Sequence, residues 1–133
     1  YASFSMFQDH PFFGIGPKLY RKYCKYEKYE FFDACSTHPH NTYFQLLAET
    51  GIFGAIPIML SFFYVSYLLL KYIYKNLVGN ISDKQYYSIM FLVSIFISLW
   101  PLGTTGNFFN NWLDFIYVLP LPFLLLINKN EKY

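Results

Sequence analysis

The chain contains three long apolar segments that are separated by shorter polar ones. The first carries no charged residue for nineteen positions, from Ile52 to Leu70. A helix needs about 20 residues to cross the hydrocarbon core of a bilayer. We therefore predict an all-α integral membrane protein with three transmembrane helices, at about 52–74, 86–102 and 113–127.

The third segment is the shortest and contains Pro120 and Pro122. Prolines would break a soluble helix, but a membrane helix tolerates them when its neighbours satisfy the freed carbonyl groups. The alternative for all three segments is that they are buried core helices of a soluble protein. We favour the membrane interpretation, because 133 residues are too few to cover three such helices.

The composition agrees with this interpretation. Hydrophobic residues make up 55% of the chain and charged residues 14%, whereas a soluble domain is about 25% charged. A net charge of +2, with no basic stripe, argues against nucleic acid as a partner. The chain begins with Tyr1 and has no basic region typical of a signal peptide, so we expect a fragment of a larger protein.

A polar region of about fifty residues precedes the first predicted span, and its end reads "HPHNTYFQLLAETGIFG". Pro39 disfavours helix at the preceding residue, and Asn41 or Thr42 can cap a helix. We predict a short amphipathic surface helix at about 41–50. Its free N–H groups would favour an anion such as a phosphate. Glu49, beside the span, is either solvated at the interface or a substrate contact.

Four glycines are expected to have structural roles. Gly14 and Gly16 permit positive φ, and together with a following proline they predict a turn. Gly51 is expected to end or bend the surface helix, and Gly54 to let it pass into the span. Cys24 and Cys35 lie in the same polar region, eleven residues apart. Facing an oxidising compartment they would form a disulfide; otherwise they are two free thiols.

Lysine positions suggest the orientation, because positive charges close to a span favour the cytoplasmic side. On this basis, we predict that 75–85 and the carboxy-terminal tail are cytoplasmic. Residues 1–51 and 103–112 then face outward together. The outward group of basic residues, Lys18 to Lys28, either forms a solvated face or attracts anionic membrane lipid.

One motif resembles a known family. His40 and Asn41 are followed by nine residues, Gly51, two residues and Gly54. This spacing resembles the signature of the O-antigen ligase and O-antigen polymerase family. The stretches "DHPFFGIGPKLY" and "WPLGTTGNFFNNW" resemble that family's neighbouring elements. The resemblance extends over nearly the whole chain and implies a single carboxy-terminal part, residues 1–133, of a polytopic glycosyltransferase.

The resemblance implies a function at the bacterial inner membrane. Such enzymes transfer a glycan from a polyprenyl diphosphate carrier, on the periplasmic face, to an acceptor hydroxyl. The acceptor is lipid A-core for a ligase, in lipopolysaccharide synthesis, or another repeat unit for a polymerase. No metal, cofactor or nucleotide sugar is expected, and the isolated fragment is expected to be inactive.

The resemblance also implies residue roles. His40 would be the catalytic base, since an imidazole ordinarily titrates near pH 6.5, at about the pH where it must take a proton. Alternatively, His40 only hydrogen-bonds the acceptor or the diphosphate. Asn41, His38, Arg21 and Glu49 are candidate substrate contacts, although His38 matches no position of the motif. The arginines that would clamp the diphosphate are expected before residue 1.

The alternative from another class is a non-enzymatic membrane subunit of a glycan export complex. Transport predicts ionisable groups inside the spans. The segments 53–70 and 88–102 contain none, while polar residues gather in the predicted outward loops. We therefore favour chemistry at the membrane surface.

Overall fold

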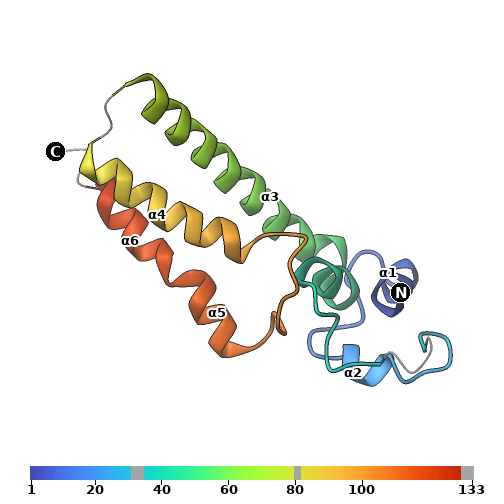
Figure 1. The fold of residues 1–133 in the computed structure, drawn as a ribbon. Helices are drawn as coiled ribbons and strands as arrows, with labels where there is room; N and C mark the ends of the chain where they lie inside the picture. Colours follow the sequence, from blue (N-terminus) through green and yellow to red (C-terminus); the bar gives the residue numbers. More distant parts are fainter. Residues whose placement is uncertain (31–34, 80–81, 130–133) are drawn as a thin grey trace. The chain divides into compact units, whose positions relative to one another are not determined.

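The computed structural model describes residues 1–30, 35–79 and 82–129, and the regular elements in these ranges are all helices (Figure 1). The all-α prediction is confirmed for this part of the chain. The last four residues of the predicted cytoplasmic tail, and residues 80–81 of the predicted cytoplasmic loop, lie outside it. The helices are α1 (Ala2–Asp9), α2 (Tyr20–Tyr23), α3 (Thr42–Val78), α4 (Asp83–Ser98), α5 (Asn111–Val118) and α6 (Pro120–Lys129).

The chain divides into two compact units, each of which is described here by itself. The loop unit consists of Tyr1–Met59 and Pro101–Asp114. The helical unit consists of Leu60–Trp100 and the chain from Phe115 onward. Helix α3 contributes its first part to the loop unit and its second part to the helical unit.

Helix α3 is interrupted at Gly51, where φ is 65° and ψ is −163°. In an unbroken helix, the N–H groups of Ile52 and Phe53 would donate to the carbonyls of Ala48 and Glu49. The interruption separates these partners and leaves two donors and two acceptors without their helical bonds.

The segment from Pro11 to Gly16 supplies all four replacement partners. The N–H of Ile52 donates to the Pro11 carbonyl at 2.8 Å, and that of Phe53 to the Phe12 carbonyl at 3.4 Å. In the opposite direction, the N–H groups of Ile15 and Gly16 donate to the Ala48 and Glu49 carbonyls, both at 2.9 Å. We call this reciprocal exchange of four bonds the glycine junction.

Two glycines make this close backbone approach sterically feasible. Gly14 and Gly51 both have a φ of 65°, in the left-handed region that L side chains rarely adopt. A Cβ on Gly51 would overlap the backbone of Phe12 and Phe13, and one on Gly14 would overlap the backbone from Ala48 to Thr50. Both residues are therefore fixed as glycine by conformation and by space.

The loop unit has a small core, and a polar triad lies at its edge. Met6, Ile15, Tyr20, Cys24, Tyr29 and Ala48 are buried together. Cys24 and Cys35 are joined in a disulfide, with Cα atoms 5.5 Å apart. The hydroxyl of Tyr29 donates to Asp9 Oδ2 at 2.7 Å, and Lys28 Nζ lies 2.6 Å from the same oxygen. The two contacts to Asp9 fasten Lys28 and Tyr29 to the end of α1.

The helical unit is a pairing of apolar helices. Val65 and Leu69 of α3 pack with Leu92 and Ile95 of α4, and α4 and α6 lie side by side (Figure 1). Several bounds differ from the prediction: α3 ends at Val78 rather than at residue 74, and α4 begins at Asp83 rather than at residue 86. Helix α4 ends at Ser98 rather than at residue 102, since Pro101 disfavours helix at the residue before it.

The third predicted span is divided in two, because α5 ends at Val118 and α6 begins at Pro120. A proline has no N–H to continue the ladder of hydrogen bonds. Within the described ranges, α3 alone is long and apolar enough to cross a membrane by length and composition. Only 17% of the residues in its most apolar stretch are buried, so most side chains in this part of α3 are at least partly exposed.

Replacing Gly51 with alanine should unfold the loop unit. The added Cβ meets backbone atoms and the left-handed φ is strained, so the junction must open, and we expect a loss of about 3 kcal/mol or more. Thermal unfolding of the detergent-purified protein, followed by circular dichroism, measures this. Gly79→Ala is the matched control, since the nearest atom to its Cβ would be 3.9 Å away. Equal melting of the two variants would contradict the role of the junction.

Tyr29→Phe should make the protein less stable in a pH-dependent way. The hydrogen bond to Asp9, together with burial, raises the pKa of Tyr29 to about 12. The stabilisation is thus fully present below the ordinary pKa of 10.0 and is lost as the pH rises through about 12. The bonds from Lys28 and Tyr29 lower the pKa of Asp9 from 3.8. On the acid side, the stabilisation is therefore lost as the pH falls below 3.8 through that lowered pKa.

The measurement is the free energy of unfolding of wild type minus that of Tyr29→Phe across this pH range. Tyr26→Phe serves as the control, because Tyr26 is 47% exposed and its ring contact with Tyr23 is retained by phenylalanine. A difference that stayed constant up to and beyond pH 12 would refute the proposed link to Asp9.

Candidate functional site

His40 lies on the surface at the beginning of α3. Its φ is 21°, at the edge of the left-handed region, which histidine enters more readily than most residues. Its carbonyl accepts the N–H of Thr105 at 2.9 Å. His40 is exposed. The bond from Thr105 fixes its backbone to the segment before α5.

Asn41 caps α3 and also bonds across to that segment. Its Oδ1 accepts the N–H groups of Tyr43 at 3.0 Å and Phe44 at 3.1 Å, and its Nδ2 donates to the Pro101 carbonyl at 2.7 Å. The sequence predicts that free N–H groups at the beginning of this helix could bind an anion. This prediction is wrong for the N–H groups of Tyr43 and Phe44, because both donate to the Asn41 carboxamide.

His38 stands against His40, with ring centroids 4.5 Å apart. Its Nδ1 lies 2.9 Å from Thr37 Oγ1. Its Nε2 is buried and has no hydrogen-bond partner within the described residues. Of the candidates predicted from sequence, His38, His40 and Asn41 are thus brought together at one place.

Glu49 and Gln45 form a buried network behind the site, each being only 1% exposed. Glu49 Oε1 accepts the N–H of Tyr20 at 2.8 Å, and Oε2 accepts Gln45 Nε2 at 2.9 Å. Gln45 Nε2 also donates to Asn107 Oδ1 at 2.7 Å, and Gln45 Oε1 accepts the N–H of Phe108 at 2.9 Å. The network joins α2, α3 and the segment before α5.

The interpretation of Glu49 as a solvated interfacial residue is therefore wrong. A backbone N–H and a carboxamide donate hydrogen bonds to the carboxylate inside the protein. These bonds offset the free-energy cost of removing the carboxylate from water. The role of Glu49 as a substrate contact stays a prediction. Asn41, Gln45 and Glu49 recur at a spacing of four residues, which puts them on one helix face. The spacing alone does not show that Gln45 and Glu49 on this face are buried.

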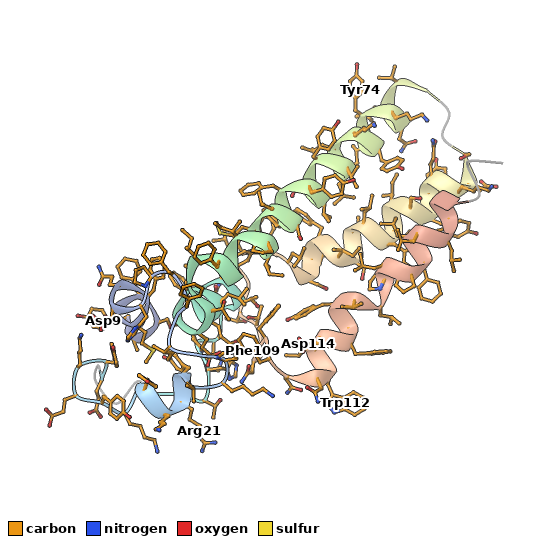
Figure 2. All side chains as sticks on the ribbon, turned by 180° about the vertical axis from the view of Figure 1, so that it is seen from behind. Asp9, Arg21, Tyr74, Phe109, Trp112 and Asp114 are labelled. Carbon is orange, nitrogen blue, oxygen red and sulfur yellow. A yellow bond between two sulfur atoms is a disulfide. The ribbon has the colours of Figure 1, made fainter. Side chains whose placement is uncertain are left out.

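Arg21 is exposed on α2, directly after the residue whose N–H Glu49 accepts (Figure 2). No bond between Arg21 and His40 is seen among the described residues. No residue of the segment 105–112 is predicted from sequence as a site residue, although the segment holds Thr105 and three asparagines. This concentration of hydroxyl and carboxamide groups is the sequence signal that could have identified the segment as part of the site. Thr42 Oγ1 donates to Thr105 Oγ1 at 2.9 Å.

Chemically, the arrangement offers an exposed imidazole on a rigid backbone, with carboxamides and an arginine elsewhere in the loop unit. Within the described residues, no cluster of three or more His, Cys, Asp or Glu side chains is placed to hold a metal ion. The exposed imidazole can accept or donate a proton.

Comparison with known families gives one finding. Residues 1–59 match the model of the O-antigen ligase family. The match confirms the resemblance predicted from the sequence, over the part of the chain that it covers. The matched O-antigen ligase region contains the glycine junction, His40, Asn41 and the buried network residues of α3. Neither the search of curated proteins nor that of solved structures found a match.

Glu49→Gln should destabilise the O-antigen ligase region by about 1–3 kcal/mol. One oxygen becomes an NH₂ group that faces another donor, either the Tyr20 N–H or Gln45 Nε2. Flipping Gln45 only moves the conflict to the N–H of Phe108. The measurement combines thermal unfolding with the rate of proteolysis within 101–110. Glu27→Gln, at an exposed position, controls for the lost charge. Unchanged stability would show that the hydrogen bonds of Glu49 do not stabilise the fold.

Proposed function

We propose that the protein acts, as part of a larger polytopic enzyme, in moving a glycan from a polyprenyl diphosphate carrier to an acceptor hydroxyl on the periplasmic face. The reaction is that of an O-antigen ligase, with lipid A-core as the acceptor. The observation that carries the proposal is the family match over residues 1–59, in which the structure has an exposed His40 on a fixed backbone.

The chemistry needs one proton acceptor beside the acceptor hydroxyl. As the hydroxyl oxygen bonds to the anomeric carbon, its proton passes to the imidazole of His40. The bond between that carbon and the diphosphate oxygen breaks, and its electron pair leaves with the carrier diphosphate. A neutral histidine suits this role. The ring of His38, 4.5 Å away, restricts the positions that the His40 ring can adopt.

Binding the diphosphate requires cations. Arg21 is the only arginine of the chain, and it is exposed in the same unit as His40. We propose it as one diphosphate contact. Asn41, His38 and Glu49 are weaker proposals. The structure gives the Asn41 and Glu49 side chains hydrogen-bonding roles within the protein.

A membrane position is supported by α3, whose apolar window is long enough to cross and is mostly uncovered. We propose that α4 and the α5–α6 pair also cross the membrane, in contact with lipid. Segments 1–51 and 103–112 were expected to face the same side. Their membership of one compact unit supports a shared side, and from the positions of the lysines we propose that this side is the periplasmic one.

His40→Ala in the full-length parent protein should abolish transfer, because the proton acceptor is removed. The test compares variants at matched membrane levels in a strain without its own ligase. It follows lipopolysaccharide ladders and the carrier-linked glycan pool. We expect loss of long-chain lipopolysaccharide, by about 10²-fold or more in rate, while polymerised glycan accumulates on the carrier.

His10→Ala is the matched control, since His10 is an exposed histidine of the same unit. Accumulation of single repeat units in His40→Ala would identify a polymerase instead. If His40→Ala behaved as wild type, His40 would not be the base, and a non-enzymatic role in glycan export would gain support.

A further inference from the structure

A second polar site lies in the loop unit. An open cavity of about 380 Å³ is formed where the turn after Gly16 meets the beginning of α5. Its volume falls at the small end of the range for ligand sites. The lining residues are Lys18, Asn107, Phe109, Asn110, Asn111 and Trp112.

The lining combines two kinds of surface that suit a sugar. The Oδ1 atoms of Asn107 and Asn110 accept N–H groups of the protein, so these two carboxamides face a ligand mainly as donors through Nδ2. The Asn111 carboxamide supplies both a donor and an acceptor, as the hydroxyl groups of a sugar require. Phe109 and Trp112 add aromatic surface, which packs against the apolar C–H face of a sugar ring. Figure 2 shows Phe109 before α5 and Trp112 on its first turn, and Trp112 is 80% exposed.

Lys18 is held in a strained conformation at the edge of this cavity. Its φ is 63°, which is uncommon for a residue with a side chain. Such strain costs stability and concentrates at functional sites. A glycine would adopt this φ without strain. The chain instead has a lysine here, and its side chain lines the cavity.

The cavity is rigidly connected to His40. Thr105 donates its N–H to the His40 carbonyl, and Asn107 follows two residues later, at most about 7 Å along the chain. Gln45 fixes Asn107 and the N–H of Phe108. The lining asparagine is therefore positioned by the same buried network that supports the beginning of α3.

We propose that this cavity binds one sugar unit of the glycan substrate, held by Lys18 and the carboxamides and stacked on Trp112. The proposal rests on the proposed function, which it extends by placing a sugar subsite beside His40. A phosphate is the less suitable ligand, because the faces of two aromatic rings are electronegative and the cavity lining contains a single cation.

The direct test is tryptophan fluorescence of the full chain in lipid nanodiscs. The chain has two tryptophans, so Trp100→Phe leaves Trp112 as the only reporter. Phenylalanine retains the ring contacts of Trp100 with Phe62 and Phe96. Glucose, galactose, their N-acetylamino forms and glucuronate are titrated, with inorganic phosphate as the competing probe. We expect a saturable shift and protection from iodide quenching with at least one sugar.

Lys18→Gly in the same background separates binding from folding. Glycine relieves the strained φ, so the fold is kept or stabilised, while affinity for the sugar should fall about tenfold. Lys22→Ala, on the exposed side of α2, is the control and should leave affinity unchanged. No saturable response to any sugar, or a response to phosphate alone, would overturn the proposal.

Transfer assays separate this proposal from the function it rests on. In the full-length parent, Lys18→Gly and Trp112→Leu should raise KM about tenfold with little change in kcat. If His40→Ala leaves transfer intact but sugars still bind beside Trp112, the proposed catalysis fails and the subsite stands. If transfer depends on His40 but no sugar binds, the subsite alone is refuted.

Discussion

The exchange of four backbone hydrogen bonds at Gly51 is the constraint on which the loop unit depends. A helix that bends sharply within a buried region leaves donors and acceptors that must be paired. Here the segment from Pro11 to Gly16 pairs them in both directions. The segment from Pro11 to Gly16 and the part of α3 around Gly51 are thereby fixed in one register, because a shift of one residue would break all four of these bonds.

This register determines where the buried carboxylate lies. Glu49 follows Ala48, whose carbonyl is in the junction, and its own carbonyl accepts from Gly16. With its backbone fixed, its side chain reaches the Tyr20 N–H and Gln45. Gln45 in turn holds Asn107 and Phe108, so backbone pairing at Gly51 is transmitted to a segment some sixty residues away along the chain. One helix face thus organises both neighbouring loops.

Much of this architecture could be predicted from local sequence signals, and some could not. The glycine turn and the interruption at Gly51 follow from residue types with strong conformational preferences. The burial of Glu49 and the contribution of 101–110 depend on tertiary contacts between residues distant in sequence, and helical periodicity cannot distinguish a solvated polar face from a buried polar network. The third predicted segment is divided before Pro120, because a proline has no N–H to donate within a helix.

The polar groups of the loop unit fall into two populations with different surroundings. Asn41, Gln45, Glu49 and Asn107 have their hydrogen bonds within the protein, and changing them chiefly alters the fold. His40, Arg21, Lys18 and Trp112 are exposed, and their side chains add little to the core. A catalytic surface needs the second population to be reactive and the first to be rigid. The loop unit holds both populations, in the first part of α3 and in the segments packed against it.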